Sequence, residues 1–280
     1  MKEAMRSFKM ATWLGWQIES NWTDPFLFGI YSIAKPVSAA LILVVMYSIV
    51  AQGGPGHPLF PYMYVGNAFY IYVGAVLIGI SWAIVADREE YGTLKYIAAA
   101  PLAMLWYLLG RGMARTIIGT ISVIVTLAIG VLFLQVPIAL PAVDWLLFAV
   151  AMALGLSSLM VMGLLLAGVS FLIARHAGFI GEAVAGALYL FTGAIFPLEV
   201  LPSLLQPIGY VLPVTYWLEA IRRALLGARG GPTFAAWSDA QVVGALAVSM
   251  LVWGAISVAY FRYAENRARA RGLLDWQTQY

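Results

Sequence analysis

The chain has no cysteine and little charge: Asp, Glu, Lys and Arg together make up 10% of its 280 residues, against about 25% in an average soluble domain. Without cysteine it forms neither disulfides nor thiolate metal sites. The sequence also lacks any Gly-Lys pair, which excludes the P-loop that cradles the phosphates of a nucleotide. The chain is therefore not expected to hydrolyse ATP by itself.

The residues that are present are strongly apolar. Hydrophobic residues make up 62% of the chain, and the mean hydropathy is +0.87. A membrane crossing takes about 20 helical residues, and backbone groups in lipid must be satisfied within the helix. Six long apolar runs predict an all-α polytopic membrane protein with a single transmembrane domain over residues 1–280. The expected spans lie near 26–51, 62–86, 112–134, 145–172, 180–197 and 240–262.

Basic residues indicate the orientation, because they stay on the cytoplasmic side during insertion. Most of the 16 Lys and Arg fall on one side if both termini are cytoplasmic, as expected for a multi-pass protein of a prokaryotic plasma membrane. Orientation also accounts for the net charge of +3, so nucleic-acid binding is not expected. The two histidines, His57 and His176, then lie on opposite faces of the membrane, and no metal site is expected.

The first residues of the chain have the composition of an interfacial helix. The segment 2–24 mixes charged residues with Trp13, Trp16 and Trp22, and an indole prefers headgroup depth. It contains no apolar core of the kind found in a cleaved signal peptide. We expect an amphipathic helix along the inner membrane surface.

A charged segment, residues 88–101, joins the second and third predicted spans on the cytoplasmic side. Gly92 permits a chain reversal, Thr93 can cap the next turn, and Pro101 ends it. The apolar positions Leu94 and Ile97 have helical spacing, which fits docking into a groove on a partner as well as resting on the bilayer. The candidate coupling residues are Glu89, Glu90, Gly92, Thr93, Leu94, Ile97 and Pro101.

Four prolines break the apolar stretch after the fifth predicted span into pieces too short to cross. Such segments are tolerated at membrane depth when packed against protein or a wet cavity, so residues 197–226 predict a re-entrant helical hairpin on the outer side. Glu219 can pair with Arg222 or Arg223 on one helical face. The candidate hairpin residues are Pro197, Glu199, Pro202, Pro213, Tyr216, Glu219 and Arg222.

Both segments resemble one family. The run EEYGTLKYI (89–97) with Pro101 resembles the coupling-helix signature of type-2 ABC exporter permeases. The runs FPLEVLP (196–202) and LPVTYWLEAIR (212–222) are similar to the end of span five and the external re-entrant helices of the same family. The resemblance covers nearly the whole chain, with the elbow helix, six spans, coupling helix, hairpin and basic tail in family order.

The resemblance implies a transport subunit that pairs with a second permease, identical or homologous, above two separate ATP-binding subunits. Those subunits would bind ATP and Mg, and this chain would hold no cofactor. The substrate is expected to be an amphiphilic small molecule or a lipid. A polysaccharide exporter of the same superfamily is the alternative, and an ATP-independent secondary transporter, a channel or a membrane-embedded enzyme are the rival classes.

Small and polar side chains indicate where a second permease and a pathway lie. The candidate seam residues Gly181, Ala185, Gly186 and Gly193 allow close packing of helices in lipid. Asn67 and Tyr70 of span two belong either to a pathway or to the aromatic belt. Lys35 of span one either lines a cavity or extends its amine to the inner headgroups.

Overall fold

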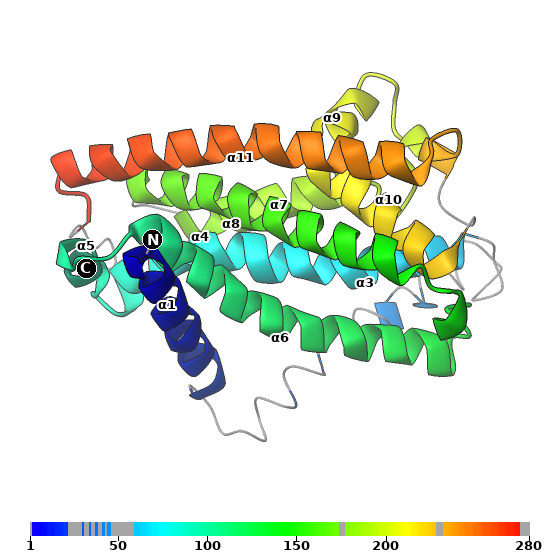
Figure 1. The fold of residues 1–280 in the computed structure, drawn as a ribbon, viewed down its shortest axis with the longest axis horizontal. Helices are drawn as coiled ribbons and strands as arrows, with labels where there is room; N and C mark the ends of the chain where they lie inside the picture. The colour runs from blue at the N-terminus through cyan, green and yellow to red at the C-terminus, as the bar shows by residue number, and fades with distance from the viewer. Residues whose placement is uncertain are drawn as a thin grey trace.

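The computed structural model describes residues 2–21, 59–173, 177–227 and 232–274, together with isolated positions between 30 and 45. Every regular element in these ranges is a helix, and no strand occurs in them. The long helices lie side by side along the long axis of the molecule (Figure 1). The all-α prediction is confirmed for this part of the chain.

The elements follow one another in a simple order. The α-helices are α1 (Lys2–Asn21), α3 (Phe60–Tyr72), α4 (Gly79–Val85), α5 (Leu94–Ala99), α6 (Met104–Phe133), α7 (Trp145–Leu172), α8 (Ala177–Phe191), α9 (Gln206–Val211), α10 (Pro213–Leu226) and α11 (Asp239–Ala270). The π-helical segments η2 (Val73–Ile78) and η3 (Ala86–Glu90) continue α3 and α4. Short 3-10 turns are η4 (Leu140–Ala142), η5 (Leu198–Val200) and η6 (Pro232–Phe234).

In the described residues, four helices are long and apolar enough to cross a membrane: Phe60–Glu90, Met104–Phe133, Trp145–Leu172 and Asp239–Ala270. A shorter apolar helix, Gly178–Phe191, corresponds to the fifth predicted span. Most of the first predicted span lies outside the described residues, so the count of six remains a prediction.

The second predicted span is one continuous helix, Phe60–Glu90, here called the span-two helix. Pro61 occupies its first turn, where a missing N–H costs nothing. The helix runs past the predicted end at 86 because the Arg88 guanidinium donates to the carbonyls of Ser170 and Ile173. A charge satisfied by protein in this way has no need to reach water.

Helix α6 begins at Met104, whereas the prediction began it at 112. Arg111 lies outside the predicted span and Arg115 inside it. Both arginines can lie within α6 because each forms an ion pair with a carboxylate. Arg111 pairs with Asp87 of the span-two helix, and Arg115 pairs with Glu19 of α1.

The predicted interfacial segment 2–24 is helical over Lys2–Asn21, and α1 crosses α6 near one end of the bundle (Figure 1). Two glycines allow this crossing to be close. A Cβ on Gly15 would lie 2.9 Å from the Ala114 Cβ, and one on Gly110 would lie 2.5 Å from the Phe8 carbonyl oxygen. Helix α1 therefore packs on protein as well as exposing Trp13, whose placement at a membrane surface remains a prediction.

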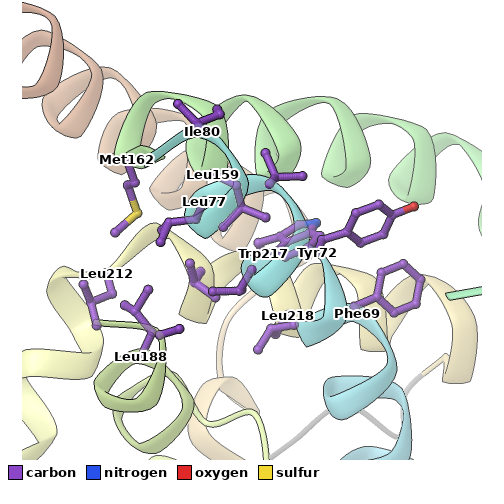
Figure 2. Close-up of a cluster of buried hydrophobic side chains, with 14 of the residues drawn as sticks. Phe69, Tyr72, Leu77, Ile80, Leu159, Met162, Leu188, Leu212, Trp217 and Leu218 are labelled. Carbon is purple, nitrogen blue, oxygen red and sulfur yellow. The ribbon is translucent and has the colours of Figure 1, made fainter. Parts of the chain in front are cut away.

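The core centres on an indole from the short helix α10. Trp217 is fully buried and reaches between the span-two helix and α7 (Figure 2). Its ring centroid lies 6.3 Å from that of Phe69 and 6.1 Å from that of Tyr72. Gly155 on α7 leaves room for it, because a Cβ there would come closer than 3.0 Å to the indole. Helix α10 is thereby fixed to the long helices.

Candidate functional site

Helix α5 lies at one end of the bundle, beside the start of α1, whereas α9 and α10 lie toward the opposite end (Figure 1). The predicted segment 88–101 is divided between two elements. Glu89 and Glu90 complete the span-two helix, and α5 itself covers Leu94–Ala99. Gly92 lies between them with a φ of +60°, a left-handed conformation that reverses the chain at low cost.

The two sides of α5 face different surroundings. Leu94 is 1% exposed and belongs to the chain's own core, with Ile97 partly buried against it. Tyr96 on the other side is 68% exposed, and Tyr91 just before the helix is 50% exposed. Leu94 therefore holds α5 to the bundle, and the two tyrosines are the part that another protein can reach.

The termini of α5 are also fixed by the chain. Thr93 is the residue before the helix, but it does not cap α5, because its N–H and hydroxyl donate to the Asp87 carbonyl at 2.8 and 3.4 Å. Ala100 is extended, as expected before Pro101, and this ends the helix. From α11, the Arg269 guanidinium donates to the Ala98 carbonyl at 2.8 Å.

A buried polar cluster lies where α5 joins the span-two helix. The Asp87 carboxylate accepts from the Arg111 guanidinium at 3.1 Å and from the Tyr107 hydroxyl at 2.8 Å. Residues 107 and 111 are one turn apart on α6, so both reach the same carboxylate. Sequence reasoning missed this cluster, although an acid closing one span and a Tyr-Arg pair at i,i+4 opening the next were visible signals.

At the opposite end, α9 and α10 form two short helices joined at Leu212, consistent with the predicted hairpin. Pro197 and Pro213 are buried, whereas Pro202 is exposed. The exposed Glu199 side chain accepts from the Thr233 hydroxyl at 2.8 Å. The re-entry of this hairpin into a membrane remains a prediction.

Arg222 fixes the hairpin to two spans. Its guanidinium is 1% exposed and donates to the backbone carbonyls of Tyr62, Gly193 and Ala194 at 3.0, 2.7 and 3.1 Å. The guanidinium carbon also lies 3.6 Å from the centre of the Tyr62 ring. Gly193 has a φ of +71° and turns the chain just beyond α8, so α8 ends at Phe191 where the prediction continued to 197.

The predicted ion pair of Glu219 forms with Arg223, at 2.9 Å. Arg223 also meets Asp239 at the start of α11, at 3.0 Å. Beside this pair, Tyr216 donates its hydroxyl to the Tyr210 carbonyl at 2.6 Å. The hairpin is thus bound to the start of α11 as well as to the core.

The predicted pathway residues of span two, Asn67 and Tyr70, form hydrogen bonds with α8. The Tyr189 hydroxyl donates to the Asn67 side-chain carbonyl, and the Tyr70 hydroxyl donates to the Ala185 backbone carbonyl. The Tyr70 and Tyr189 rings lie 4.6 Å apart between centroids. Lys35, the third predicted pathway residue, lies outside the described residues.

The four predicted seam positions have different surroundings. Gly181 faces the span-two helix, since a Cβ there would lie 3.3 Å from the Ile78 side chain. Ala185 is buried and accepts the bond from Tyr70. Gly186 is exposed, and a Cβ there would meet no described atom within 4 Å. Gly193 belongs to the turn beyond α8, so Gly186 is the seam residue with open space beside it.

The comparisons with known proteins point to one family. Residues 7–226 match the model of the family described as ABC-2 type transporter. The probable multidrug ABC transporter permease YbhR of Escherichia coli K12, and the protein of that name from E. coli O157:H7, are each 26% identical to this chain over 157 residues. The aligned region covers 54% of this chain but 40% of those relatives.

Proposed function

The chain belongs to the ABC-2 type transporter family as a membrane permease without an ATPase site of its own, and we propose that it serves an ATP-driven exporter. Its substrate would be an amphiphilic small molecule or a lipid, moved out of the cytoplasm or the inner leaflet. The relatives named as multidrug permeases favour a small molecule. A polysaccharide exporter of the same superfamily is the alternative, but no feature of the described residues favours it.

One observation carries the proposal: the exposed Tyr96 of α5, with the exposed Tyr91 just before the helix, belongs to a segment that is joined through Asp87 to both the span-two helix and α6. A force that a partner protein applies to Tyr91 and Tyr96 would therefore be transmitted to both the span-two helix and α6. We infer that the ATP-binding subunits dock here. Closure of those subunits on ATP would need to favour one arrangement of the spans by a few kcal/mol over the other.

The charges of the two ends support a cytoplasmic position for α5. Its end of the bundle carries Lys95 and the Arg-rich end of α11, as the orientation rule expects of an inner face. The segment after the fifth predicted span carries three basic residues that do not follow that rule, Arg222, Arg223 and Arg229, and Arg229 lies outside the described residues. Arg222 is held by carbonyls and Arg223 by Glu219 and Asp239, so neither of these two presents a free charge.

Transport into inside-out membrane vesicles tests the proposal. Vesicles from cells that overproduce the chain and its ATP-binding subunit should accumulate a fluorescent amphiphile when ATP is added, and vanadate should stop the uptake. A secondary transporter would instead take up the dye on an imposed proton or sodium gradient without ATP. That second outcome would remove the exporter assignment.

A further inference from the structure

One carboxylate interrupts an otherwise apolar span. Glu182 is the one charged residue in the sequence of the apolar helix Gly178–Phe191. Its side chain is exposed, and none of the described residues forms an ion pair with it. At a rise of about 1.5 Å per residue it lies about 8 Å along the helix from Ala177. Acidic side chains within an apolar helix of a membrane protein are rare, and each is a candidate functional position.

The neighbours of Glu182 along α8 form a stripe beside the span-two helix. Residues three, four and seven apart lie on one side of a helix, so Gly178, Glu182 and Tyr189 share this stripe. At its first position, a Cβ on Gly178 would lie 2.6 Å from the Trp82 ring. At its last, Tyr189 donates to Asn67. Glu182 thus lies between an indole and the polar Asn67–Tyr189 contact.

Aromatic surface and open space accompany the carboxylate. Trp82 is 37% exposed, and Phe179, one turn from Glu182, is 73% exposed. Gly186 lies one turn away on the other side and has no described atom within 4 Å of a Cβ position. Gly74, in the π-helical segment η2 of the span-two helix, is equally open. Wide π-helical turns recur at functional sites.

We propose that Glu182 is the recognition group for an organic cation with an apolar body, held by the carboxylate and by the exposed face of Trp82. Carboxylates and aromatic faces both attract cations, and a bulky apolar body fills space that the open glycines leave. The inference rests on the proposed exporter function and narrows its substrate from amphiphiles in general to cationic ones. Anionic amphiphiles are repelled by the same group.

Two probes of equal shape and opposite charge test the inference. Tetraphenylphosphonium and tetraphenylborate are titrated separately, at equilibrium, onto the purified full chain in nanodiscs of phosphatidylcholine, which carries no net charge. The wild-type chain should bind the cation more tightly than the anion. Glu182→Gln should weaken binding of the cation by about tenfold, equivalent to about 1.4 kcal/mol, and leave binding of the anion unchanged or tighter.

Two further variants serve as controls. Glu182→Asp keeps the charge and should retain most of the affinity for the cation. Glu3→Gln removes an exposed carboxylate from α1 and should change neither probe. Equal binding of the cation by wild type and Glu182→Gln, or no binding of it at all, would overturn the inference. Loss of permease pairing in Glu182→Gln, with binding of the cation intact, would assign the carboxylate to the second subunit and overturn it too.

The assay needs neither ATP nor the ATP-binding subunit. Its failure therefore leaves the exporter assignment to be judged by ATP-driven uptake in vesicles. Conversely, binding of the cation through Glu182 together with transport driven by an ion gradient would support the binding site but contradict ATP as the energy source.

Discussion

Arg111 of α6 and Asp87 of the span-two helix form an ion pair of 3.1 Å, with side chains only 7% and 3% exposed. The backbone carbonyl of the same Asp87 accepts the N–H of Thr93, where α5 begins. One residue thus contacts α6 through its side chain and the start of α5 through its backbone. If ATP-binding subunits move α5 as proposed, Asp87 is the residue through which that movement would reach the spans.

We expect the pair to be essential to stability. Removing one partner of a buried pair leaves the other charge unsatisfied and costs about 3–5 kcal/mol. Arg111→Met should therefore lower the midpoint of thermal unfolding, followed by tryptophan fluorescence of the chain in detergent. Glu265→Gln, which breaks the more exposed pair with Arg269, should change stability by less than about 1 kcal/mol.

The double variant Asp87→Asn with Arg111→Met removes both charges and should be more stable than Arg111→Met alone. If the double variant is instead the less stable of the two, the stability does not come from the charge pairing.

Gly66 is expected to be intolerant of any side chain. A Cβ there would lie closer than 3.0 Å to the Arg222 guanidinium and to the Ala194 carbonyl, so Gly66→Ala should displace the arginine that fixes the hairpin. Glycine to alanine inside a helix otherwise stabilises by up to about 1 kcal/mol. Gly186→Ala, with open space around it, is the matched control. A Gly66→Ala protein as heat-stable as wild type would contradict this role of Arg222.

Substitution of Gly186 by leucine tests the predicted seam. Gly186 and Ala255 of α11 are both exposed in helices, so leucine at either position should leave the single chain folded. If α8 faces the second permease or the pathway, Gly186→Leu should reduce transport or pairing much more than Ala255→Leu does. Normal export by Gly186→Leu, with crosslinks between permeases forming through α11, would place the seam elsewhere.

The orientation can be read from single cysteines, because the chain has none of its own. Ala99, the last residue of α5, and Ala236, between α10 and α11, are both small and exposed. A cysteine at 236 should react with an impermeant maleimide added to intact cells, and one at 99 should react only after the membrane is opened. Labelling of position 99 from outside would invert the topology.

The sequence was informative where periodicity and special residues act locally. The apolar runs predicted the long helices, and Gly92 and Pro101 predicted the limits of α5. It was uninformative where distant elements meet. The residue types around Asp87 and Arg111 were a signal, but their pairing depends on how two helices pack, and nothing in the local sequence shows that Arg222 donates to three carbonyls while Arg223 pairs with Glu219. The ends of α6 and the span-two helix were misplaced for this reason, because tertiary pairing let charged residues stay inside the helices.

If an ATP-binding subunit drives this permease through α5, ATP hydrolysis by the complex, purified through a tag on this chain, should depend on the exposed side of α5. Tyr96→Asp should leave the chain folded, because the side chain is 68% exposed, yet weaken the association and reduce vanadate-sensitive hydrolysis in proportion. Leu94→Asp should differ, because a carboxylate buried in the core lowers stability itself. We expect an ATPase to co-purify with the wild-type chain and to be lost from Tyr96→Asp. A fully assembled complex with unchanged, substrate-stimulated hydrolysis in Tyr96→Asp would contradict it.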